Sequence, residues 1–164
     1  MTIKEYIALS ARTDADLGDF NNSLHWRLGA VNEFGEFLSP LKKAVVKGED
    51  PDREKLVDEL GDVFWYVAKG ARLTGFSLPE TYGYLQATDL ITFIKQFHEY
   101  WGKEDVMGLL CVLIGLANFY EIEIPEILIK NLAKLQARHP EGFDINNQKY
   151  TDAEIEAIGE ATTK

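Results

Sequence analysis

Hydrophobic residues recur at helical spacing over two long stretches of the chain. Steps of three and four residues place such side chains on one face of an α-helix. The pattern therefore predicts two long amphipathic helices. In the first helix the apolar face consists of Leu24, Leu28, Val31, Phe34, Leu38, Leu41 and Val45, and in the second of Leu56, Leu60, Val63, Val67 and Ala71.

A short polar segment separates the two predicted helices. Gly48 breaks the helical pattern, and Asp50 followed by Pro51 is typical of a helix start, because proline is tolerated in the first helical turn. The two helices are therefore expected to run antiparallel, as a helical hairpin. The N-cap candidates of the first helix are Asn21, Asn22 and Ser23.

The rest of the chain also has helical patterns, and strand patterns are nearly absent. Further helices are expected at residues 3–12, 87–101, 104–120 and 125–138. The sequence thus predicts an all-α protein, a helical bundle built on the long antiparallel hairpin. Residues 1–143 are expected to form the domain. Residues 144–164 are polar and are expected to form an appendage with a short helix, since residues 151–154 (TDAE) fit a capping box.

One internal similarity adds a second way to interpret the bundle. A shift of 46 residues aligns residues 58–80 with residues 104–126, with Pro-Glu at the end of both segments and apolar positions in register. Low identity leaves two interpretations open, chance and a degenerate internal duplication. A duplication would mean that two related helical units pack on each other.

Composition limits the function classes. The 164 residues suffice for one core, and the net charge of -10 repels a phosphate backbone, so nucleic-acid binding through a basic patch is excluded. The N-terminal stretch lacks the apolar core of a signal peptide, and the apolar run 106–117 is shorter than a membrane span. We therefore expect a cytoplasmic protein that does not enter a membrane.

Two pairs of acidic residues lie on the predicted hairpin. Glu33 and Glu36 are three residues apart on the first helix, and Glu59 and Asp62 are three apart on the second, so each pair shares a helix face. The hairpin places the two pairs at similar distances from the turn that joins the helices. Four facing carboxylates repel one another unless a cation neutralises them, and a ligand set of oxygens alone favours Mg²⁺, with Mn²⁺ able to substitute. The alternative is that these acids are solvated surface residues.

The sequence around these acids resembles a known family. The segments RLGAVNEFGEF (27–37), DELGDVFWYVAKGARLTG (58–75) and KNLAKLQARHPEGF (130–143), with the opening IKEYIALSART, are similar to the MazG-like, all-α nucleoside triphosphate pyrophosphohydrolases. The resemblance covers about residues 3–76 and 124–143. The combination of ExxE, ExxD and a downstream NxxKLxxR is more specific than either acidic pair alone.

The resemblance implies an enzyme that hydrolyses a nucleoside or deoxynucleoside triphosphate between the α and β phosphates, giving the monophosphate and pyrophosphate. It implies that Glu33, Glu36, Glu59 and Asp62 form the catalytic, metal-binding set. It also implies that Asn131, Lys134 and Arg138 contact phosphates. Many members carry another acid directly before the first Glu of the motif, where this chain has Asn32. That difference leaves the identity of a general base open.

Two further residues have two interpretations each. Trp26 lies two helical turns before Glu33 on the same face, where its ring either stacks on a substrate base or packs in the core. Lys69 extends the face of Asp62, where it either contacts a phosphate or is an ordinary exposed lysine.

The acids and the NxxK motif belong to different parts of the proposed duplication. Asn131 and Lys134 follow Pro125, whereas the same offsets after Pro79 carry Leu85 and Thr88. We therefore expect both parts to meet in one chain, within a protein that also forms a homo-oligomer.

The alternative function is a catalytically inactive helical module that senses nucleotides or mediates assembly.

Overall fold

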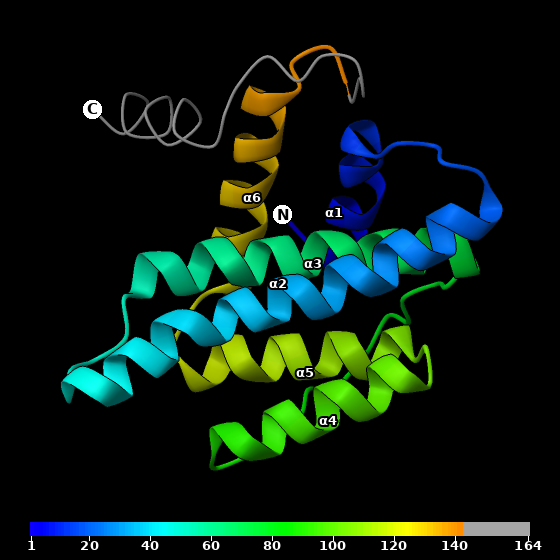
Figure 1. The fold of residues 1–164 in the computed structure, drawn as a ribbon. Helices are drawn as coiled ribbons and strands as arrows, with labels where there is room; N and C mark the ends of the chain where they lie inside the picture. Colours follow the sequence, from blue (N-terminus) through cyan, green and yellow to red (C-terminus); the bar gives the residue numbers. More distant parts are fainter. Residues whose placement is uncertain (143–164) are drawn as a thin grey trace.

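The computed structural model describes residues 1–142 (Figure 1). The all-α prediction is confirmed, and the helices expected after residue 86 lie within three residues of their predicted bounds. The predicted appendage 144–164 lies outside the described residues. The elements are α1 (Ile3–Leu9), the 3-10 helix η1 (Ser10–Thr13), α2 (Asp19–Lys47), α3 (Arg53–Thr74), α4 (Leu90–Gly102), α5 (Val106–Phe119) and α6 (Ile124–Arg138).

The long helices α2 and α3 form the predicted antiparallel hairpin (Figure 1). Gly48 ends α2 with a φ of 68°, a left-handed conformation that costs glycine little. The start of α3 lies slightly later than predicted. Asp52 rather than Asp50 is the N-cap, and its side chain accepts a hydrogen bond from the backbone N–H of Lys55.

The N-terminus of α2 differs from the prediction. The helix begins at Asp19 after Gly18, so none of the three predicted cap residues is its N-cap. Asn22 is buried and serves the preceding segment instead. Its Oδ1 accepts from the N–H of Leu17 and its Nδ2 donates to Asp16. The polar run was misassigned because a side chain in the first turn can also hydrogen-bond backward to the entering loop.

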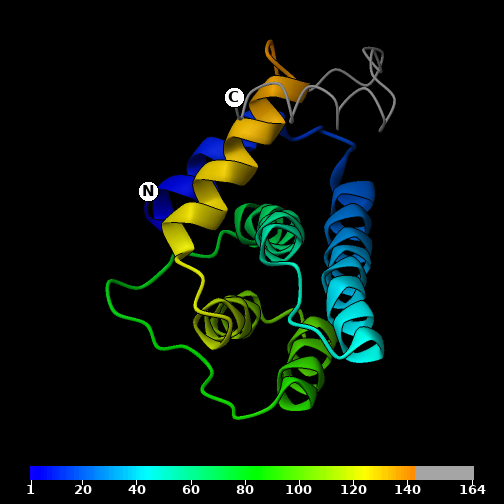
Figure 2. The same cartoon turned by 90° about the vertical axis from the view of Figure 1, so that its left-hand side faces the viewer.

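A second hairpin, α4 with α5, packs against the first, so that α2, α3, α4 and α5 form a four-helix arrangement (Figure 2). The rings of Phe34 in α2 and Phe97 in α4 stack with centroids 3.7 Å apart. The aligned segments of the internal similarity contain most of α3 and all of α5, the second helix of each hairpin. The match is incomplete, because Pro79 lies in the non-helical connection 76–89 whereas Pro125 lies in α6. The duplication stays a prediction.

The helices α1 and α6 cross the other side of α3 (Figures 1 and 2). With α2 and α5 they surround α3, where twelve of the 22 residues are buried. None of the helices within residues 1–142 is by itself long and apolar enough to span a membrane; only the pair α5 and α6, bent by 108°, passes that test together. The crossing of α6 brings its side chains against the acidic face of α3.

Candidate functional site

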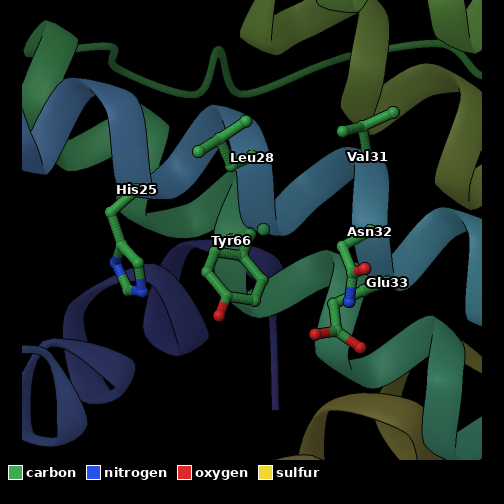
Figure 3. Close-up of a pocket in the computed structure, with 7 residues that line it drawn as sticks. His25, Leu28, Val31, Asn32, Glu33 and Tyr66 are labelled. Carbon is green, nitrogen blue, oxygen red and sulfur yellow. The ribbon is translucent and has the colours of Figure 1, made fainter.

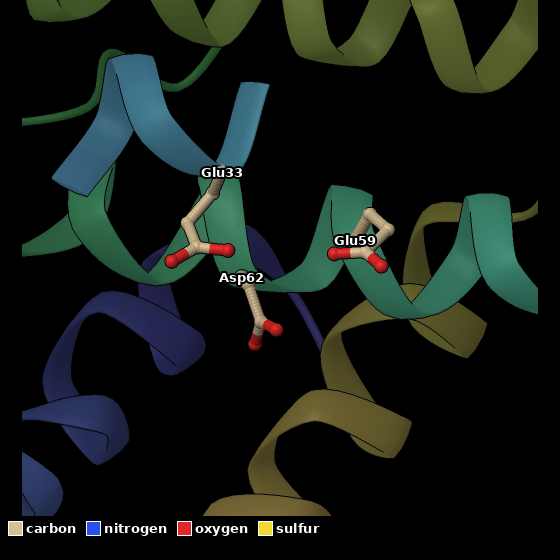
Figure 4. Close-up of side chains that lie close together, drawn as sticks. All are labelled: Glu33, Glu59 and Asp62. Atoms are coloured by element: carbon tan, nitrogen blue, oxygen red, sulfur yellow. The ribbon is translucent and has the colours of Figure 1, made fainter. Parts of the chain in front are cut away.

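Three carboxylates from the hairpin converge on one point. Glu33 from α2 and Glu59 and Asp62 from α3 each offer an oxygen, and these atoms all lie within 4.8 Å of one another (Figure 4). All three side chains are partly buried. The spacing of three residues places Glu59 and Asp62 on the same face of α3, and the hairpin brings Glu33 opposite them. We call these three residues the carboxylate cluster.

Glu36, the fourth predicted ligand, lies outside this cluster. Its side chain is exposed and accepts a hydrogen bond of 2.9 Å from Nδ2 of Asn32. Its charge still acts on the cluster, because it raises the pKa of both Glu33 and Glu59. The structure therefore brings together three of the four predicted acids and leaves the fourth at the rim.

The carboxylate cluster is electrostatically unfavourable. Burial and the neighbouring acids raise the pKa of Glu33 to about 7 and that of Glu59 to about 7. Burial also raises the pKa of Asp62, although Lys134 counteracts part of this effect. Three oxygen donors whose ionised forms repel one another are a ligand set for a hard divalent cation. The residues present could therefore hold a metal ion of this kind.

The raised pKa values predict how stability depends on pH. Glu33 and Glu59 have an ordinary pKa of 4.5 and a folded-state pKa of about 7, so between these values the folded chain binds more protons than the unfolded chain. The free energy of unfolding should therefore fall as the pH rises through this window. The measurement is the melting temperature in chelator from pH 5 to 8, for wild type and Glu33→Gln. A slope that is equally steep in both proteins would contradict this assignment.

Helix α6 supplies the partners of Asp62. Asn131 donates from Nδ2 to Oδ1 of Asp62 at 2.7 Å, and Nζ of Lys134 lies 2.7 Å from Oδ2 of the same carboxylate. A Cβ at Gly61 would lie 2.8 Å from Cβ of Asn131, so glycine permits this close approach of α6 to α3. The NxxK motif and the acids thus meet within one chain, as the sequence predicted.

Arg138, the third predicted phosphate contact, lies farther along α6. It is partly buried, and its charge opposes part of the rise that burial causes in the pKa of Asp62. Its Nε is buried without a hydrogen-bond partner among residues 1–142. The charges of Arg138 and Lys134 therefore act on the same carboxylate, Asp62.

The structure favours one of the two interpretations of Trp26 and contradicts both interpretations of Lys69. The ring of Trp26 is only 1% exposed and packs over Gly70, where an added Cβ would lie 2.9 Å from it, so Trp26 is a core residue rather than a stacking platform. Lys69 is also only 1% exposed. Its Nζ lies 2.5 Å from Asp14 and donates to the carbonyl of Ala15, so it is neither an exposed lysine nor placed to bind phosphate.

Two contacts around Asp62 were missed by the sequence analysis. Asp58 forms an ion pair with Lys134, and its position four residues before Asp62 was a usable signal. The buried hydroxyl of Tyr6 donates to Oδ1 of Asn131 at 2.6 Å, which orients the amide so that its Nδ2 points to Asp62. Tyr6 and Asn131 lie 125 positions apart in the sequence, so no local pattern relates them.

A surface cavity of about 500 Å³ adjoins the carboxylate cluster (Figure 3). Glu33 belongs to both. The other residues that line the cavity are His25, Leu28, Gly29, Val31, Asn32 and Tyr66.

Comparison with known protein families, curated proteins and solved structures gives no match. The function must therefore be inferred from the site itself.

Proposed function

We propose that this protein is a metal-dependent nucleoside triphosphate pyrophosphohydrolase, which cleaves its substrate between the α and β phosphates. The observation that carries the proposal is the convergence of Glu33, Glu59 and Asp62 beside Asn131 and Lys134. The combination of acidic and cationic groups suits a substrate that brings phosphates together with a divalent cation. The resemblance to the MazG-like family supplies the choice of the α–β bond.

The residues of the site divide into two roles. Glu33, Glu59 and Asp62 would hold Mg²⁺ or Mn²⁺, which when bound polarises phosphoryl oxygens and lowers the pKa of a coordinated water. Lys134 and Asn131 would donate to phosphate oxygens from the α6 side. Tyr6 positions Asn131 through one hydrogen bond, and Asp58 positions Lys134 through an ion pair.

A direct assay separates this proposal from the alternative of an inactive nucleotide-sensing or assembly module. We expect the protein to release pyrophosphate from at least one member of a panel of ribo- and deoxyribonucleoside triphosphates in Mg²⁺, and to lose this activity in chelator. The Glu33→Gln variant controls for contaminating hydrolases. Nucleotide binding without pyrophosphate release from any member of the panel would favour the inactive module.

A second prediction concerns Lys134. Charge-assisted hydrogen bonds contribute about 1.5–3 kcal/mol, so Lys134→Met should lower kcat/KM by about 10-fold or more. Because Lys134 offers no lone pair to a metal and places a positive charge beside Asp62, its removal should not weaken Mg²⁺ binding. The measurements are steady-state kinetics and calorimetric titration of the nucleotide-free protein with Mg²⁺.

The matched control for this variant is Lys130→Met. Lys130 lies one turn earlier on α6 and pairs with Glu54 and Glu126, away from the carboxylate cluster. It should have kinetics close to wild type. If Lys134→Met lost Mg²⁺ affinity together with turnover, Lys134 would be a residue that positions Asp62 rather than one that contacts phosphate.

A further inference from the structure

The cavity beside the carboxylate cluster has the composition of a site for an uncharged ring. Its lining contains no lysine or arginine, and Glu33 contributes a carboxylate, so a phosphate group is disfavoured there. In Figure 3 the side chains of Leu28 and Val31 lie on one side of the cavity, and His25, Tyr66 and Glu33 lie on the other. A ligand in the cavity would therefore meet apolar groups on one side and polar or aromatic groups on the other.

His25 and Tyr66 supply the aromatic and hydrogen-bonding groups. Their rings meet edge to face with centroids 5.3 Å apart, and His25 also contacts Trp65. Nδ1 of His25 is buried without a hydrogen-bond partner in the described part of the chain. Burial and the nearby charge of Lys69 lower the pKa of His25, so its imidazole is neutral at pH 7 and offers one donor and one acceptor.

Gly29 is what allows the ring of Tyr66 to line this cavity. A Cβ at position 29 would lie 2.0 Å from the Tyr66 ring, so any larger residue must displace that ring. Gly35, on the same helix, has no atom within 4 Å of an added Cβ. The two glycines therefore provide a matched pair of variants, one that disturbs the cavity and one that does not.

We propose that this cavity binds the nucleobase of the substrate, with His25 and Tyr66 as the residues that contact the base. The inference rests on the proposed function, because Glu33 links the cavity to the cluster where the phosphates would bind. The cavity volume of about 500 Å³ lies within the range of small-molecule sites. The core position of Trp26 leaves the base contact to His25 and Tyr66.

The test compares nucleotides with a phosphate chain that carries no base. The probes are the α,β-imido analogues of ATP, GTP, CTP and UTP and inorganic tripolyphosphate, all titrated calorimetrically in Mg²⁺. Wild type should bind at least one analogue about 10-fold or more tightly than tripolyphosphate. The ratio of the affinity for the analogue to the affinity for tripolyphosphate should fall close to one in Gly29→Ala and in His25→Ala. Both variants should keep the wild-type affinity for tripolyphosphate. Gly35→Ala should keep both.

Two results would overturn the assignment of the cavity. One is a wild-type protein that binds no analogue more tightly than tripolyphosphate. The other is a wild-type ratio in both Gly29→Ala and His25→Ala. Either result can occur alongside Mg²⁺-dependent pyrophosphate release, so failure of the base site is distinguishable from failure of the proposed function.

Discussion

Replacing Glu59 with glutamine should lower Mg²⁺-dependent nucleoside triphosphate hydrolysis by about 100-fold or more, on the scale of lost charge stabilisation in a transition state. Glu59 is one of the three carboxylates within 4.8 Å of one another, and its amide analogue cannot supply the negative charge. Mg²⁺ affinity, measured by calorimetry, should fall with the turnover. Retention of near wild-type activity would remove the carboxylate cluster from the mechanism.

The same variant should not be less stable than wild type when metal is chelated. Burial and the charges of Asp58, Asp62 and Glu36 raise the pKa of Glu59 to about 7, so the ionised form is unfavourable in the folded chain. Glutamine removes this repulsion. A clear loss of melting temperature in chelator would contradict the electrostatic account and would make the activity loss a folding effect.

Two variants calibrate the result for Glu59. Glu54→Gln, on the same helix, removes an exposed carboxylate that pairs with Lys130 and should leave turnover near wild type. Glu36→Gln should cost less activity than Glu59→Gln, because Glu36 is exposed and lies outside the carboxylate cluster. Equal losses at positions 36 and 59 would indicate that Glu36 joins the cluster when the site is loaded.

Replacing Asp14 with alanine should destabilise the protein by about 3–5 kcal/mol, the range for a buried ion pair that loses one partner. Asp14 accepts from Nζ of Lys69, which is 1% exposed, and from the guanidinium of Arg72. Without Asp14 the ammonium of Lys69 stays buried, and within residues 1–142 it keeps only the carbonyl of Ala15 as a hydrogen-bond acceptor. Urea denaturation gives the free energy of unfolding.

The control and the rescue variant follow from the same geometry. Glu99→Ala removes an exposed ion pair with Lys103 and should leave the free energy of unfolding nearly unchanged, because solvent screens exposed ion pairs. Adding Lys69→Met to Asp14→Ala should recover part of the lost stability, because the unpaired charge is gone. If Asp14→Ala cost no more than Glu99→Ala, the buried ion pair would not be what holds the segment before α2 against α3.

The hairpin and its acids could be predicted because both depend on local spacing. Apolar residues at steps of three and four defined α2 and α3, and the same periodicity placed Glu59 and Asp62 on one face. The turn at Gly48 then brought Glu33 opposite them. The spacing did not separate Glu33 from Glu36, because their positions relative to the cluster depend on how α2 rotates against α3.

The roles of Lys69 and Trp26 depended on tertiary packing. The expectation of an exposed lysine assumed that α3 has a solvent face at position 69, but every residue from 67 to 71 is buried. A lysine there needs a buried partner, and Asp14 lies 55 residues away in a segment without helical pattern. The contact between Tyr6 and Asn131 is likewise set by the crossing of α1 and α6.

Hydrolysis in ¹⁸O-labelled water tests the central claim most directly. With Mg²⁺ and the triphosphate that wild type cleaves fastest, mass spectrometry of both products locates the attacked phosphorus. The account predicts one labelled oxygen in the nucleoside monophosphate and unlabelled pyrophosphate. In Glu59→Gln the label should be incorporated more slowly, by about 100-fold or more. Label in pyrophosphate, or a nucleoside diphosphate with labelled inorganic phosphate, would contradict attack at the α phosphorus.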